Sequence, residues 1–196
     1  CAPSLLERTL HTTMRSTVAE IVPRYFYPPD VDNTKSIKAI LEVARDGEAL
    51  SVGAVVWGNS MKSGAWVSGY ASTEDFMRAE MVQLLLSRCT EDLPLVVYTK
   101  GFRDLLPKVA MSEGMTKAGK PFKGYAALKP IQLAMDRGDW TLEPPEPVAY
   151  GLQSARAVAR LGLPLALKER FAFPSHKQKH PDWLVIASSF GEAASG

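Results

Sequence analysis

Cysteine and histidine are scarce in this sequence, whose 196 residues include two cysteines, Cys1 and Cys89, and three histidines. So few cysteines exclude a disulfide framework, and no zinc-type spacing is present, so a reducing compartment is the default expectation. His176 and His180 have the four-residue spacing of a helical metal pair. Prolines on both sides argue against a helix there, and no metal site is predicted.

Long apolar runs and a strong charge imbalance are also missing. No stretch approaches the ~20 apolar residues of a membrane helix, and no basic–apolar–cleavage pattern opens the chain. We therefore expect a cytoplasmic or nuclear protein without a membrane partner. The formal net charge is +2, which neither indicates nor excludes a nucleic-acid partner. Hydrophobic residues make up 46% of the chain, and together with its length this suits one domain with a sizeable core.

Residues 1–35 are expected to form a helical arm and a proline-rich connector. Apolar side chains recur every four positions from Leu6 to Val18, which predicts an amphipathic helix over residues 4–21. The prolines of "VPRYFYPPDVDNTKS" prevent that helix from continuing. Cys1 could act as a nucleophile with its own amino group as base, but hydrolases of that class begin with a strand.

The main domain is expected over residues 36–164, with residues 165–196 as a C-terminal extension packed on it. Three strand-like runs separated by turn signals predict a meander. A helix, a short apolar strand, two helices, a strand and a last helix follow, the last one stopped by Gly162 and Pro164. This order predicts an α/β protein with a five-stranded mixed sheet flanked by helices, to which "DWLVIASSF" could add a strand.

Local motifs accompany this order of elements. "DGEALSVGAVVW" joins Asp46 and a glycine to a Gly-Ala-Val-Val run, "WVSGYAS" combines aromatic and small residues, and "RAEMVQLLL" carries Glu80 in a helix. Over roughly residues 37–162 the chain resembles the ribonuclease H domain, particularly the version found in retroelement polyproteins. Active members of this family hydrolyse phosphodiesters with two metal ions held by carboxylates. The resemblance places Asp46 and Glu80 at two of those carboxylate positions.

The other two carboxylate positions are not acidic in this chain. Lys100 stands where the family strand ends in Asp-Ser, and Arg156 or Ala157 stands at the aspartate of the last helix. A lysine at ~4 Å would repel Mg²⁺ by roughly 4 kcal/mol per unit charge at an effective dielectric of ~20. The resemblance therefore implies a catalytically inactive domain with no cofactor, in which Lys100 pairs with Asp46 and Glu80 in place of the metal.

Lysines provide the candidate nucleic-acid contacts. A flexible loop over residues 112–124 and the basic tail contain Lys117, Lys120, Lys123, Lys177 and Lys179. Contacts from these side chains to phosphates would be weak, salt-dependent and indifferent to sequence. A merely solvated loop is the alternative interpretation of the first three.

The predicted function is an inactive ribonuclease H-like domain that serves as a nucleic-acid or protein binding scaffold within a larger assembly or polyprotein. Two alternatives remain open. One is an active Mg²⁺-dependent ribonuclease H-type endonuclease that uses Asp46, Glu80 and a further carboxylate such as Asp104. The other is an unrelated α/β protein-interaction domain.

Overall fold

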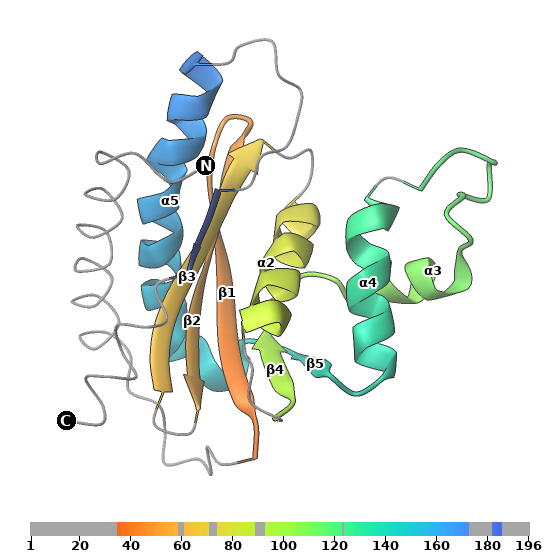
Figure 1. Cartoon of the computed structure of the whole chain (residues 1–196), viewed down its shortest axis with the longest axis horizontal. Coiled ribbons are helices and arrows are strands. Elements are labelled where there is room, and N and C mark those ends of the chain that lie inside the picture. Colours follow the sequence, from red (N-terminus) through yellow and green to blue (C-terminus); the bar gives the residue numbers. More distant parts are fainter. Residues whose placement is uncertain are drawn as a thin grey trace.

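The computed structural model describes residues 35–58, 61–70, 74–88, 93–122, 124–172 and 182–185, so residues 1–34 of the expected arm lie outside it (Figure 1). The strands are β1 (Ile37–Asp46), β2 (Ala49–Gly58), β3 (Met61–Tyr70), β4 (Leu95–Tyr98), β5 (Trp140–Glu143) and β6 (Asp182–Val185). The helices are α2 (Glu74–Arg88), α3 (Leu105–Met111), α4 (Tyr125–Asp136), the 3-10 helix η1 (Glu146–Gly151) and α5 (Leu152–Ala172). Within these ranges, no helix combines the length and apolar content needed to cross a membrane.

The described strands form one mixed sheet in the order β5-β4-β1-β2-β3-β6. β1, β2 and β3 make the predicted antiparallel meander, while β4 and β5 run parallel to β1. The predicted five-stranded mixed sheet flanked by helices is confirmed and is consistent with a ribonuclease H-like arrangement. The added strand expected within "DWLVIASSF" is also confirmed, as β6 paired antiparallel to β3.

Side chains that alternate between the two faces of the sheet divide the core into two layers. Val52, Ala54 and Val56 of β2 face a cluster shared with α2 and α4, whereas Val55 and Trp57 face a cluster shared with α5. Figure 1 shows α2 on one face of the sheet and α5 on the other, with α4 beside α2 and α3 beside α4. A period of two along a strand and helices on both faces produce this three-layer packing.

Helix α5 does not stop at Gly162 and Pro164 as the sequence predicted, but continues to Ala172. Gly162 is a packing residue, because a side-chain carbon there would lie 2.7 Å from Ser51 Oγ. Pro164 removes the hydrogen bond to the carbonyl of residue 160, but both positions are exposed, so water can serve that carbonyl. The domain boundary predicted after residue 164 consequently falls inside a helix.

Candidate functional site

The candidate site is the edge of the sheet where the parallel strands β1, β4 and β5 point their carboxyl ends. Ile40 of β1 lies opposite Tyr98 of β4, and Tyr98 lies opposite Glu143 of β5. Residues that follow these three positions therefore share one edge. Open sheets with parallel strands bind ligands outside the carboxyl ends of those strands, so this edge is the candidate binding site.

Asp46 is not part of that edge. It lies six residues beyond Ile40 and pairs with Ala49 across the tight turn between β1 and β2, where it is exposed. Lys100 lies only two residues beyond Tyr98. At ~3.3 Å per residue, the four-residue difference separates Asp46 from Lys100 by roughly 13 Å along the strands. The Asp-Gly motif is a turn: Gly47 has a φ of +60°.

Glu80 also lies away from the edge. On α2 it shares a face with Phe76, which approaches the turn before α4, and with Gln83, whose amide donates to the carbonyl of Ala127 in α4 at 2.9 Å. The residues of α2 that meet the end of β4 are instead Asp75 and Arg78. At ~100° per residue, Glu80 points well over a quarter turn away from both of them.

Lys100 does not make the expected pairing with Asp46 and Glu80. Its side chain is exposed, and none of the ion pairs among the described residues joins it to either acid. The structure therefore corrects the predicted replacement of a metal by Lys100. At this position Lys100 has the surroundings of an ordinary surface lysine.

A different cation occupies the edge on the α2 face. Arg78 pairs with Asp75 at 2.8 Å and with Glu74 at 3.3 Å, and only 13% of its side chain is exposed. Arg45, near the end of β1, reaches Glu74 at 3.8 Å. Gly101 allows the close approach, because a side-chain carbon there would lie 2.7 Å from Arg78 Cδ and would overlap the Asp75 carboxylate. The acids here are already matched by guanidinium groups.

On the α5 face the edge carries Glu42, a residue that the sequence analysis missed. It lies two residues beyond Ile40, level with Lys100, and its carboxylate is 3.6 Å from Arg156 of α5. Arg156 of the last helix thus lies beside β1, and its acidic neighbour is Glu42 and not Asp46. The signal available in the sequence was the strand alternation of "IKAILEVA", which places Ile40 and Glu42 on one face.

Two tyrosines complete this edge near η1. Tyr98 stacks on Trp57 with ring centroids 6.2 Å apart and an interplanar angle of 17°. Burial raises the pKa of Tyr98 above its usual 10.0, and the Glu143 carboxylate raises it further. Burial, followed by the proximity of Tyr98, also raises the pKa of Tyr150. Both phenols stay protonated at neutral pH and add no charge to the edge.

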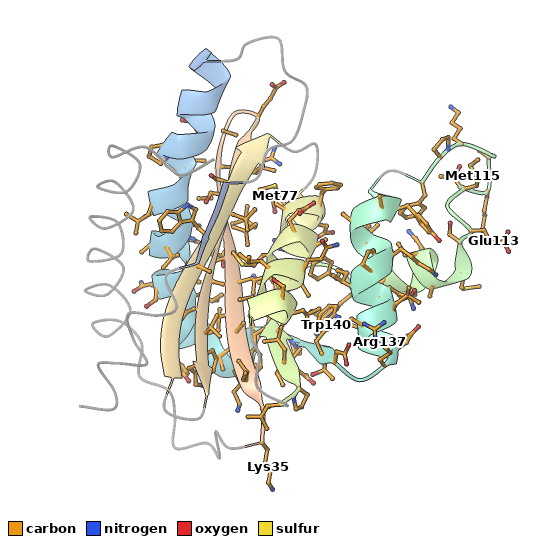
Figure 2. All side chains as sticks on the ribbon, in the orientation of Figure 1. Lys35, Met77, Glu113, Met115, Arg137 and Trp140 are labelled. Atoms are coloured by element: carbon orange, nitrogen blue, oxygen red, sulfur yellow. The ribbon has the colours of Figure 1, made fainter. Side chains whose placement is uncertain are left out.

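The lysine loop between α3 and α4 is held by its own backbone. Thr116 donates its N–H to the carbonyl of Lys120 at 2.7 Å, and the loop closes through a bridge between Met115 and Pro121. The loop predicted as flexible is therefore a hydrogen-bonded turn with Lys117 and Lys120 exposed. Figure 2 shows Met115 at the projecting end of this loop. Lys123, Lys177 and Lys179 lie outside the described residues.

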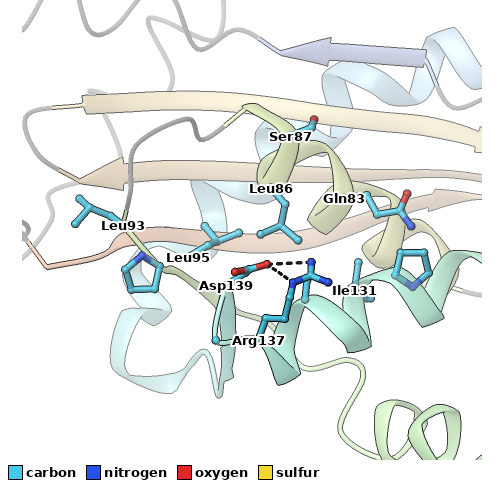
Figure 3. Close-up of a pocket in the computed structure, with 12 residues that line it drawn as sticks. Gln83, Leu86, Ser87, Leu93, Leu95, Ile131, Arg137 and Asp139 are labelled. Atoms are coloured by element: carbon cyan, nitrogen blue, oxygen red, sulfur yellow. Dashed lines mark hydrogen bonds and ion pairs between the residues drawn. The ribbon is translucent and has the colours of Figure 1, made fainter.

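A hollow of about 840 Å³ lies at the opposite, amino end of β4, between α2 and α4 (Figure 3). Its polar groups are paired within the chain. Arg137 and Asp139 form an ion pair at 3.0 Å, and the Ser87 hydroxyl donates to the carbonyl of Leu84 at 2.8 Å. Among its described lining residues, these charged and hydroxyl groups already have partners, and the carboxyl edge remains the candidate site.

No family model and no curated protein matches the sequence. Within the described ranges, no three histidine, cysteine, aspartate or glutamate side chains group closely enough to hold a metal ion.

Proposed function

We propose that the chain is a catalytically inactive ribonuclease H-like domain that acts as a nucleic-acid or protein binding scaffold within a larger assembly or polyprotein. The main support for an inactive site is the pairing of the Arg78 guanidinium group with Asp75 and Glu74, beside Gly101 at the end of β4. A divalent ion at this point would have to displace a largely buried positive charge. Like charges a few ångströms apart oppose each other by several kcal/mol at an effective dielectric of ~20.

The placement of the acids also supports an inactive site. Two-metal hydrolysis needs several carboxylate oxygens that converge on one point. Asp75 belongs to α2 on one face of the sheet, whereas Glu42 pairs with Arg156 of α5 on the other face. Asp46 lies at the distant turn between β1 and β2. These three acids do not converge.

A hydrolysis assay tests the inactive assignment. We expect no Mg²⁺- or Mn²⁺-dependent cleavage of an RNA–DNA hybrid above background. Asp75→Asn, Glu42→Gln and Glu80→Gln serve as matched carboxylate variants, because each removes one charge without a large change of shape. Cleavage that disappears in EDTA and in any of these variants would establish the active endonuclease instead.

The lysine loop supports the binding half of the proposal. Lys117 and Lys120 are exposed on the projecting turn, where Met115 is 55% exposed, and Met111 at the end of α3 is 89% exposed. Lysines bind phosphates through charge, and exposed methionines supply an adaptable apolar contact. The loop thus presents the chemistry of a weak contact surface, away from the paired charges of the carboxyl edge.

Neutralising the loop is expected to weaken nucleic-acid binding and to reduce its salt dependence. For Lys117→Gln/Lys120→Gln, the slope of log affinity against log salt should become shallower by about 1.4–1.8, because each of the two phosphate contacts contributes roughly 0.7–0.9. Fluorescence anisotropy with a labelled oligonucleotide at several salt concentrations measures the slope. Lys35→Gln/Lys100→Gln removes the same charge elsewhere, and equal effects of the two pairs would refute the assignment to the loop. Absence of binding by the parent chain would favour the protein partner.

Removing the positive charge of Arg78 is expected to destabilise the fold and to make the carboxyl edge more responsive to Mg²⁺. Arg78→Gln should lower the free energy of unfolding by about 1–2 kcal/mol, less than the ~3–5 kcal/mol of a fully buried pair. Mg²⁺ should then stabilise this variant more than the parent, because Asp75 has lost its guanidinium partner and Glu74 keeps only Arg45. Thermal melts at matched ionic strength measure both effects. Arg137→Gln breaks an exposed pair and is the control; an equal response of both variants to Mg²⁺ would contradict the assignment.

A further inference from the structure

The hollow between α2 and α4 is suited to an apolar occupant (Figure 3). Its charged lining residues, Arg137 and Asp139, pair with each other, and the Gln83 amide donates to the carbonyl of Ala127. Most of the remaining lining is apolar and includes Leu86, Leu93, Pro94, Leu95, Pro130 and Ile131. Because these polar groups already have partners, an occupant would be held by apolar contacts rather than by hydrogen bonds.

Helix α4 continues this apolar surface outside the hollow. Ala126, Pro130 and Leu133 are exposed and lie four and three residues apart, so they share one face of the helix. Leu133 is 43% exposed, and Pro130 belongs both to this face and to the hollow. An apolar surface beside a hollow is typical of an interaction site. At ~1.5 Å per residue, the 12 residues of α4 offer a face roughly 18 Å long.

The chain enters the fold beside this hollow. Ile37 of β1 lies opposite Leu95 of β4, and the N–H of Ile37 donates to the carbonyl of Pro94 at 3.0 Å. Pro94 and Leu95 both line the hollow. Figure 2 shows Lys35 at the amino end of β1. Residues 1–34, which lie outside the described residues, therefore join the domain immediately next to the hollow.

The sequence of that segment provides a stripe of matching chemistry and length. The apolar positions of the amphipathic helix predicted over residues 4–21 are Leu6, Leu10, Met14 and Val18. At ~1.5 Å per residue this stripe would be roughly 18 Å long, the same as the face of α4. The proline-rich connector over residues 22–34 can extend to roughly 40 Å at ~3.1 Å per residue, so its length does not prevent docking.

We propose that the helix predicted over residues 4–21 docks, through its apolar stripe, into the hollow and onto the exposed face of α4 of its own chain. A tethered segment has an effective concentration of about 1 mM, so even a weak apolar contact is well populated. The segment contains two arginines and two glutamates, and the rim of the hollow contains Arg137 and Asp139, so net charge does not oppose the contact. A protein partner for this surface would have to displace the arm.

Methyl NMR of the full chain tests the contact from the side of the arm. The methyl signals of Leu86, Leu93 and Ile131 report on the hollow. Leu10→Glu/Met14→Glu places two charges in the apolar stripe and should shift all three signals, because the arm leaves the hollow. If this variant leaves the three signals at their parental positions, the proposal is wrong.

A control variant and a peptide make this test specific. Thr12→Glu/Ser16→Glu adds the same two charges on the opposite side of the predicted helix and should leave the signals of the hollow unchanged. A synthetic peptide of residues 4–21, added at about 1 mM to Leu10→Glu/Met14→Glu, should return the signals toward their parental positions. Equal shifts in both double variants, or no return with the peptide, would overturn the proposal.

The Met14 methyl signal tests the contact from the side of the hollow. Pro130→Glu places a charge at an exposed position of the lining and should move this signal to its position in the urea-unfolded chain. Pro107→Glu makes the same substitution at an exposed proline of α3 outside the hollow and should not. An unchanged Trp140 indole N–H signal verifies that each variant is folded. Equal effects of the two substitutions would contradict docking in the hollow. Parental signals that change on dilution would assign the occupant to a second copy and overturn docking within one chain.

Discussion

Gly53→Val is expected to lower the free energy of unfolding by at least ~3 kcal/mol, or to prevent folding altogether. Gly53 lies in the middle of β2, where α5 crosses the sheet. A side-chain carbon at this position would overlap the carbonyl oxygen of Ala155 and lie 2.9 Å from the Cα of Ala159. These are backbone atoms, so no rotamer change can relieve the clash, and the whole helix must move. Overpacking of this kind costs typically ~1–3 kcal/mol, and more where the backbone cannot yield.

Urea unfolding followed by circular dichroism measures the effect of Gly53→Val. Gly119→Ala is the matched control, because a side-chain carbon at Gly119 meets nothing within 4 Å although φ is +74°. The control should cost only about 1 kcal/mol, the strain of a left-handed backbone. If Gly53→Val were as stable as Gly119→Ala, the result would contradict the close packing of α5 against β2 at Gly53.

Trp140→Ala is expected to destabilise the fold by about 3–5 kcal/mol, the usual cost of truncating a fully buried large aromatic residue. Trp140 is 0% exposed and begins β5, the edge strand that pairs with β4. The substitution removes the ring that Phe102 contacts and the hydrogen bond to the carbonyl of Ile131. The loss should therefore loosen α4 and β5 together.

Trp140→Phe separates the two contributions, because it keeps an aromatic ring and removes the indole N–H. We expect it to cost less than half as much as Trp140→Ala. Leu133→Ala, on the exposed side of α4 where 43% of the leucine is accessible, should change stability by under ~1 kcal/mol. Chemical denaturation of the three variants measures their free energies of unfolding and so ranks their stabilities. A Trp140→Ala variant no less stable than Leu133→Ala would contradict the burial of Trp140.

The order of the elements was predictable because each depends on local patterns. The apolar alternation of β1 and β2, the acidic first turn and apolar stripe of α2, and the turn at Asp46 all act over a few neighbouring residues. The crossover from the meander to β4 then leaves few arrangements for a sheet covered by helices on both faces. The sequence by itself therefore determined the fold class.

The position of the candidate site depended on pairing between distant segments. Asp46 was expected at the carboxyl edge because the resemblance to the ribonuclease H domain matched it to a carboxylate position of that family. The register of β1 with β4 places that edge at residues 40–42 instead, so Glu42 faces Arg156 while Asp46 serves the turn. A shift of register changes every neighbour without changing the local sequence pattern.

Side-chain partnerships were likewise decided by the tertiary structure. The sequence determined that α2 begins with acids and that small residues recur in β2 and α5. Only the packing decided that Arg78 meets those acids beside Gly101, that Gly53 lies against α5, and that α2 and α4 border a hollow. The physical reason is range: propensity and alternation act within about one helical turn, whereas ion pairs and close packing depend on segments brought together by the complete fold.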